Sequence, residues 1–315
     1  MIHKAMKRVV AAAAALLVGC GPAADAVTPG AKAASRALPP VSFPNSAVHE
    51  VPSDSGRRYQ VWVDLPASYA GSDKAYPVVF VTDPNFAFAT TRTIRDFSGQ
   101  RGRNIGEFIL VGLVHDPDVA PMQSRGRDYT PTDPRKNPQV KPGRYTGDRY
   151  GEAGAYLAYV EEKVFPLIAA NYRADMSRKT LVGHSYGSVF GFYALFTRPG
   201  LFQNYVLGSP SLWFDDHLLL KMEADYARTH KDLPAKIHMV AGSYETLGPT
   251  PRHYEDNDLA GAMTRFASTL GGRGYPSLTV SSEVAEGEDH FTVFHDVASR
   301  GLLRVLPGKG PYTSG

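Results

Sequence analysis

A serine lies at the centre of the pentapeptide Gly183-His184-Ser185-Tyr186-Gly187. The run before it, residues 179–182, predicts a short buried strand, and the apolar run at 189–196 predicts a helix. A G-x-S-x-G sequence between a strand and a helix is typical of a nucleophile elbow, a tight turn that projects the serine hydroxyl out of the sheet. This context predicts that Ser185 is the nucleophile of a serine hydrolase.

A serine hydroxyl needs a base within hydrogen-bond reach and an acid that orients the base. In α/β-hydrolases these residues follow the nucleophile in the order acid, then histidine. His290 comes after the last predicted strand and is the expected base. The acid is expected after the strand predicted at 236–242, where we favour Glu245 and keep Asp256 and Asp258 as alternatives. A Ser–His dyad without a well-placed acid also stays open.

An oxyanion hole requires two backbone N–H groups that point at the developing negative charge. One is expected from Tyr186, the residue after the nucleophile. The other is expected from the loop Asp83-Pro84-Asn85-Phe86, which follows a predicted buried strand. Proline has no N–H group, so Asn85 is the expected second donor.

Strands alternate with helices along most of the chain, and this order predicts a mostly parallel central sheet with helices on both faces, the α/β-hydrolase fold. Two antiparallel edge strands are expected before the parallel ones. The predicted strands are 46–51, 58–65, 76–82, 108–114, 179–182, 202–208, 236–242 and 277–284, and the predicted helices are 154–172, 189–196, 217–230, 257–271 and 292–303. Residues 41–307 are therefore assigned to one catalytic domain, followed by a short tail at 308–315.

One connection, residues 116–151, is much longer than the others and is rich in proline, glycine and basic residues. Loops of this length without secondary structure are usually functional lids or disordered segments. The composition fits a lid over the site or a solvated excursion equally well.

The N-terminus carries basic residues and then a short apolar run, residues 9–18, which is too short to span a bilayer and predicts a secretory signal. The run ends in Leu17-Val18-Gly19-Cys20, which resembles a bacterial lipobox. We therefore expect a lipoprotein signal at 1–19, lipidation of Cys20 and a flexible tether at 20–40. The alternative is cleavage after Ala24-Asp25-Ala26, which would give a soluble periplasmic or secreted protein.

These features predict a cell-envelope protein that meets the membrane only through a lipid anchor, with the outer membrane facing the periplasm preferred. Removal of Lys4, Lys7 and Arg8 with the signal lowers Lys+Arg from 34 to 31, which equals the 31 Asp+Glu. This balance argues against a nucleic-acid partner. The histidines show no H-E-x-x-H spacing, so no metal site is expected.

Longer stretches around the elbow resemble the esterase D-like branch of the α/β-hydrolase superfamily, and most closely its periplasmic enterobactin and salmochelin esterases. The likeness covers residues 41–303 and includes Gly208-Ser209-Pro210-Ser211-Leu212-Trp213 and Arg127-Asp128-Tyr129-Thr130-Pro131. One departure is Pro84, which stands where the family commonly has the glycine of an Asp-Gly pair.

The resemblance implies hydrolysis of a small-molecule ester through an acyl-serine intermediate, without a metal or organic cofactor. Arg127 is expected to bind substrate or to pair with a nearby acid, and Trp213 is expected to line an acyl pocket or to pack in the core. An acyltransferase on the same scaffold and a non-catalytic ligand-binding lipoprotein are the alternative functions.

Overall fold

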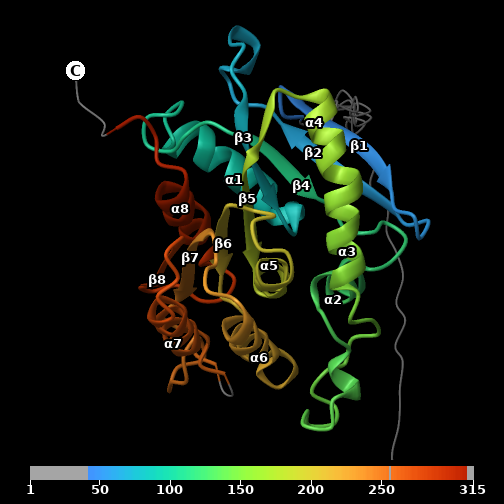
Figure 1. Ribbon diagram of the computed structural model, residues 1–315, viewed down its shortest axis with the longest axis vertical. Helices are drawn as coiled ribbons and strands as arrows, with labels where there is room; N and C mark the ends of the chain where they lie inside the picture. Colours follow the sequence, from blue (N-terminus) through green and yellow to red (C-terminus); the bar gives the residue numbers. More distant parts are fainter. Residues whose placement is uncertain (1–41, 255–256, 311–315) are drawn as a thin grey trace, which may run out of the picture. The chain divides into compact units, whose positions relative to one another are not determined.

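The computed structural model describes residues 42–254 and 257–310. Eight strands in this part of the chain form one sheet in the order β1-β2-β4-β3-β5-β6-β7-β8 (Figure 1). β1 and β2 pair antiparallel, as do β2 and β4, and all other pairs are parallel. The strands are β1 Ser46–Pro52, β2 Arg58–Asp64, β3 Tyr76–Val81, β4 Ile109–Leu113, β5 Ala174–His184, β6 Asn204–Gly208, β7 Ala235–Gly242 and β8 Leu278–Ala285. The predicted α/β-hydrolase architecture, with antiparallel strands at one edge, is confirmed.

Helices follow most of the strands and run back along the sheet. They are α1 Pro84–Thr93, α2 Pro121–Tyr129, α3 Ala153–Tyr159, α4 Phe165–Asn171, α5 Tyr186–Thr197, α6 Phe214–Thr229, α7 Leu259–Gly272 and α8 Phe294–Val305. A π-helical turn at Val160–Val164 joins α3 to α4, so the helix predicted at 154–172 is present as one continuous helical segment.

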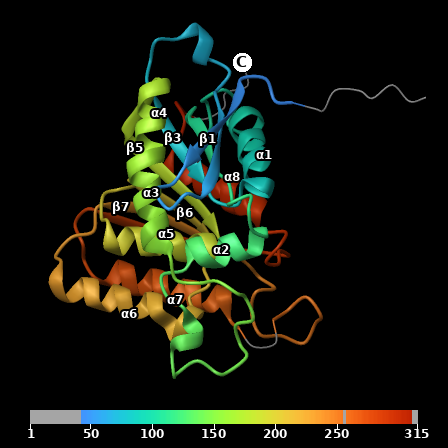
Figure 2. The same ribbon diagram turned by 90° about the vertical axis from the view of Figure 1, so that its right-hand side faces the viewer.

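Two apolar cores lie on opposite faces of the sheet, and β3 contributes to both. Val78 and Phe80 point into the larger core, which also holds buried side chains of α5, α6 and α7. Val79 and Val81 point into the smaller core with α1 and α8, which lie together on one side of the sheet in Figure 2. All residues of β3 are buried, as expected for a parallel strand covered on both faces.

The long connection at 116–151 is not structureless, because it contains α2. This helix begins at Pro121 and buries Ser124 and Tyr129. Gly126 permits a close crossing of the chain, since a Cβ atom there would lie 2.7 Å from the carbonyl oxygen of Arg149. The sequence pattern did not predict α2, because its nine residues include a glycine and few apolar side chains. Helix α1 was not predicted either.

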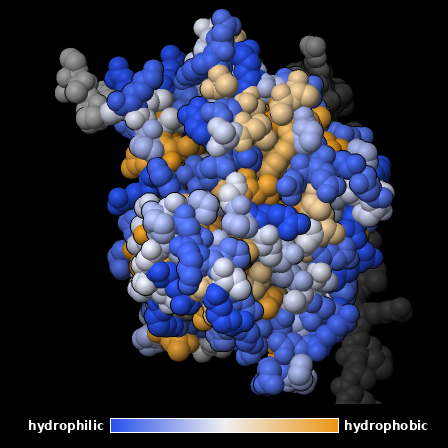
Figure 3. Space-filling view, viewed as in Figure 1, coloured by the Kyte–Doolittle hydropathy of each residue, from blue (hydrophilic) through white to orange (hydrophobic). Residues whose placement is uncertain are grey.

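The surface turned to the viewer in Figure 3 is mostly hydrophilic, with apolar residues gathered in smaller patches. Within residues 42–254 and 257–310, no helix has the length and apolar content that a membrane span requires. The predicted signal at 1–19, the tether at 20–40, the lipidation site Cys20 and the last five residues of the predicted tail lie outside the described residues.

We predict that Gly301→Ala destabilises the fold by about 1–3 kcal/mol, the usual cost of overpacking a core. A Cβ atom at this position of α8 would lie 2.2 Å from Cγ1 of Val206 on β6. The matched control is Gly271→Ala in α7, where the nearest atom would be 3.6 Å away. The control should be neutral or more stable by up to about 1 kcal/mol. Urea denaturation measures both, and equal stability of the two variants would contradict this packing account.

Candidate active site

Ser185 occupies the tight turn between β5 and α5. Its backbone angles are φ 58° and ψ −115°, which a residue with a side chain rarely adopts. The turn is attached to the end of β6, because the Ser185 N–H donates to the carbonyl of Gly208 at 2.9 Å. Strained backbone of this kind persists where the surrounding structure fixes it, and it is concentrated at functional sites.

The two glycines of the pentapeptide let neighbouring chain segments approach the turn. A Cβ atom at Gly183 would lie 2.4 Å from the carbonyl oxygen of Gly187. A Cβ atom at Gly187 would lie 2.3 Å from Oγ1 of Thr82, at the end of β3. The G-x-S-x-G spacing is therefore required by the geometry of the turn and by the loop after β3 that packs against it.

Glu245 and His290 form a hydrogen-bonded pair at the carboxyl end of the sheet. The imidazole Nδ1 of His290 donates to Oε2 of Glu245 at 2.7 Å. Glu245 follows β7 and His290 follows β8, so the parallel sheet brings together two residues that are far apart in the sequence. The bond occupies Nδ1 and leaves Nε2 as the ring nitrogen that can accept a proton.

The carboxylate of Glu245 is fully buried and is held on its other oxygen as well. Oε1 accepts from the Ser209 hydroxyl at 2.6 Å and from the Gly242 N–H at 2.8 Å. Ser209 itself has a positive φ of 41°. Three hydrogen bonds thus compensate the burial of this charge and fix its orientation toward His290.

The hydroxyl of Ser185 has one hydrogen-bond partner among the described residues, the hydroxyl of Ser211 at 3.5 Å. A direct bond from Ser185 to the His290 ring is not formed in this structure. His290 nevertheless lies next to the elbow, because its backbone carbonyl accepts a 2.8 Å hydrogen bond from Nε2 of His184. Hydrogen bonds between catalytic groups are often long without substrate and tighten when substrate binds.

His184 remains neutral in this setting. Its burial, the nearby His290 and the charge of Arg125 lower the pKa of the imidazole to about 3. Nε2 donates to His290, and the buried Nδ1 has no partner among the described residues. His184 therefore positions the backbone of His290 and adds no positive charge beside it.

The two expected oxyanion donors each lie in the first turn of a helix. Tyr186 begins α5, and Asn85 is the second residue of α1. Backbone N–H groups in a first helical turn have no acceptor within the helix and are free to bind an anion. Since Thr82 packs against Gly187, the start of α1 lies beside the start of α5, as two donors to one oxygen require.

A buried ionic network that was not anticipated from the sequence supports this loop. Asp83, with a φ of 52°, precedes α1, and its Oδ1 accepts from Arg125 at 2.7 Å and from Nε2 of His115 at 3.1 Å. Arg125 also donates to the carbonyl of His184 at 3.0 Å. Burial by itself would raise the pKa of Asp83, but the charge of Arg125 and the bond from His115 hold it below its usual value.

The structure places Arg127 in a different environment from Arg125. Its side chain is 1% exposed and binds Asp116 and Asp128. This is the pairing with nearby acids that the sequence left open. Trp213 is partly exposed, stacks on Tyr145 with ring centroids 5.9 Å apart, and lines a cavity next to the elbow.

The other acids proposed from the sequence have different surroundings. Asp258 caps α7 by accepting from the Gly261 N–H at 2.9 Å, and it pairs with Arg265. Asp256 lies outside the described residues. In the part of the chain that the structure describes, no group of three or more His, Cys, Asp and Glu residues is arranged to hold a metal ion.

Curated relatives match nearly the whole chain. A ferri-bacillibactin esterase of Bacillus subtilis is 28% identical over 87% of this chain and 93% of its own length. A siderophore triacetylfusarinine C esterase of Aspergillus fumigatus is 27% identical over 84% of this chain and 94% of its own length.

Solved structures agree with the fold. The BES protein of Bacillus cereus superposes with a TM-score of 0.72 at 25% identity, over 86% of this chain and 99% of that one. An IroE-like serine hydrolase from Shewanella oneidensis has a TM-score of 0.69 at 25% identity, over 82% and 79% of the two chains. The model of the Esterase family matches residues 53–295. Because this match spans well over half of the chain, the chain belongs to the Esterase family, and its strained serine and buried Glu–His pair lie on the corresponding α/β-hydrolase sheet.

Proposed function

We propose that the chain hydrolyses a carboxylic ester of a siderophore through an acyl-serine intermediate, with Ser185 as nucleophile, His290 as base and Glu245 as the orienting acid. The observation that carries this assignment is the 2.7 Å bond from His290 to a fully buried Glu245 beside the strained serine. A carboxylate that orients an imidazole next to a serine is the arrangement that activates a hydroxyl at neutral pH.

In the first half of the reaction, Ser185 Oγ attacks the ester carbonyl carbon while Nε2 of His290 takes the hydroxyl proton. The carbonyl oxygen becomes an oxyanion and is stabilised by the N–H groups of Tyr186 and Asn85. Collapse of this intermediate breaks the ester bond, and His290 returns the proton to the departing alkoxide. Glu245 stabilises the imidazolium throughout and stays ionised.

In the second half, water replaces the alcohol. His290 takes one proton from the water, the hydroxide attacks the acyl carbon, and the second tetrahedral oxyanion uses the same two N–H groups. Release of the acid returns the proton to Ser185. The neutrality of His184 favours both halves, because a second imidazolium next to His290 would oppose its protonation.

A siderophore ester is the substrate class that the relatives support. Two of them are named as esterases of ferri-bacillibactin and triacetylfusarinine C, and each match covers more than four fifths of both chains. A third, from Escherichia coli, is named an apo-salmochelin esterase and matches half of this chain.

We predict that Ser185→Ala abolishes hydrolysis of 4-nitrophenyl acetate and labelling by a fluorophosphonate probe, because the attacking oxygen is lost. The control is Ser299→Ala, which alters an exposed hydroxyl whose hydrogen bond within the described part of the chain is to the carbonyl of His295 in α8. Release of 4-nitrophenolate measures the hydrolysis, and peptide mass spectrometry measures the labelling. Full turnover in a folded Ser185→Ala protein would exclude the proposed mechanism.

Glu245→Gln should lower kcat by about 10⁴-fold with little change in the fold, as expected when the group that sets the histidine tautomer is lost. The matched control is Glu286→Gln, since Glu286 lies exposed in the same loop as His290. Steady-state kinetics with circular dichroism of each variant test this. A loss smaller than 10-fold for Glu245→Gln would assign the acid to another residue.

We propose further that residues 1–19 are a lipoprotein signal and that Cys20 carries the lipid anchor in the cell envelope. The support is the sequence alone, a basic and then apolar leader ending at the only cysteine of the chain. The full chain expressed in a bacterium with two membranes should sediment with membranes, and Cys20→Ala should shift it to the soluble fraction. An unchanged distribution of the Cys20→Ala chain would contradict the anchor.

A further inference from the structure

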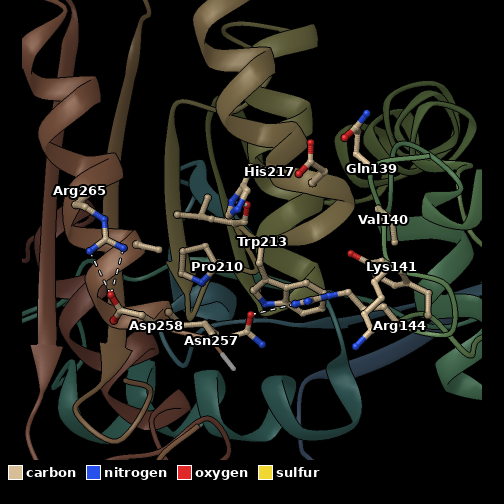
Figure 4. A pocket seen from close by; sticks show the side chains of 15 residues that line it. Gln139, Val140, Lys141, Arg144, Pro210, Trp213, His217, Asn257, Asp258 and Arg265 are labelled. Atoms are coloured by element: carbon tan, nitrogen blue, oxygen red, sulfur yellow. Dashed lines mark hydrogen bonds and ion pairs between the residues drawn. The ribbon is translucent and has the colours of Figure 1, made fainter. Parts of the chain in front are cut away.

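A polar cavity of about 360 Å³ opens beside the candidate site, between the segment that follows α2 and the starts of α6 and α7 (Figure 4). Pro210 and Leu212 contribute to its wall, and Ser211 between them is the residue whose hydroxyl lies 3.5 Å from Ser185 Oγ. The cavity therefore lies beside the loop that contacts the nucleophile, close enough to receive a part of the substrate remote from the ester bond.

The charges that line the cavity do not balance. Its two described acids already have cationic partners, because Asp216 binds Lys221 at 2.6 Å and Asp258 binds Arg265 at 3.2 Å. Lys141 and Arg144 are exposed cations of the lining, and neither has a carboxylate partner among the described residues. The only polar side-chain contact of Arg144 among them is with the neutral amide of Asn257, at 3.1 Å. Among the residues that the structure describes, these two side chains therefore leave the cavity lining with a net positive charge.

An aromatic surface lies directly beside these cations. The Arg144 guanidinium is 4.9 Å from the ring centroid of Trp213, and Tyr145 stacks on the same indole. Figure 4 shows Arg144 next to Trp213, with Lys141 nearby on the same segment. A cation beside a partly exposed ring suits a ligand that is both flat and negatively charged.

The segment that carries Lys141 and Arg144 is hydrogen-bonded to the start of α6. The turn Asp215–His217 has three consecutive left-handed residues. The Asp215 carboxylate accepts from Thr132 and from Asn137, the latter at 2.6 Å, and its N–H donates to the Tyr145 hydroxyl at 2.8 Å. The strained turn thus fixes both flanks of the segment that bears the two cations, so the cavity is preformed.

We propose that this cavity is a substrate subsite for a planar anionic group, an aromatic ring bearing negative charge, which Lys141 and Arg144 bind electrostatically while the ring lies beside the exposed part of Trp213. The inference rests on the proposed function, since it assigns to the same ester substrate a second point of attachment. It also names specificity-determining residues outside the Ser185, His290 and Glu245 set.

The test uses two pairs of esters that differ by one carboxylate. The first pair carries the charge on the acyl side, 4-nitrophenyl 4-carboxybenzoate against 4-nitrophenyl benzoate. The second carries it on the alcohol side, 4-acetoxybenzoate against 4-acetoxybenzamide. Because the side of the ester that enters the cavity is not specified by its lining, a preference in either pair supports the subsite.

We expect Lys141→Gln/Arg144→Gln to lower the anionic-to-neutral ratio of kcat/KM at least 10-fold in one pair, mainly through KM, while kcat/KM for the neutral esters stays within 2-fold. Salt should weaken the wild-type preference, since exposed charges are screened. The matched control is Arg228→Gln/Lys236→Gln, which removes the same charge from the end of α6 and the start of β7. The control should leave the ratio unchanged.

An unchanged ratio in the Lys141→Gln/Arg144→Gln protein, in both pairs, would overturn the subsite. Hydrolysis of the neutral esters would continue in that case, so the proposed esterase mechanism would stand. If instead no ester is hydrolysed by the wild type, binding of the inert 4-carboxybenzamide measured by calorimetry decides the matter. Weaker binding to the double variant supports the subsite, and equal binding overturns it.

Discussion

The buried carboxylate of Glu245 is the point on which the architecture of the site depends. It accepts hydrogen bonds from Ser209 after β6, from Gly242 at the end of β7 and from His290 after β8. The carboxyl ends of three neighbouring parallel strands are therefore tied to one charged group. An unpaired carboxylate at this depth would cost several kcal/mol, so its three donors stabilise the loops as well as the charge.

A second buried charge plays the corresponding part on the other side of the serine. Asp83 precedes α1, and Arg125 on α2 bridges it to the carbonyl of His184. The same arginine thus links the helix that would offer Asn85 to the residue before the nucleophile. The position of α2 in the long connection is explained by this link, because the segment supplies a supporting side chain to the site as well as a wall of the adjoining cavity.

Much of this arrangement could be predicted from the sequence. The pentapeptide located Ser185, and the order of strands placed Glu245 and His290 at the same edge of the sheet. What escaped prediction depends on short helices and on burial. Arg125 and Arg127 are two residues apart, so on a helix they point in different directions. Only the structure shows that Arg125 reaches the elbow and that Arg127 is enclosed by acids. Without α2, the periodicity that separates them could not be seen.

The central claim is that the His290 ring, oriented by Glu245, serves the oxygen of Ser185. The most direct measurement is a crystal structure of the protein after reaction with a fluorophosphonate. The account predicts phosphorus bonded to Ser185 Oγ, Nε2 of His290 within about 3 Å of that oxygen, and the phosphonyl oxygen facing the N–H groups of Tyr186 and Asn85. An adduct on a different residue, or a His290 ring turned away from the modified serine, would contradict it.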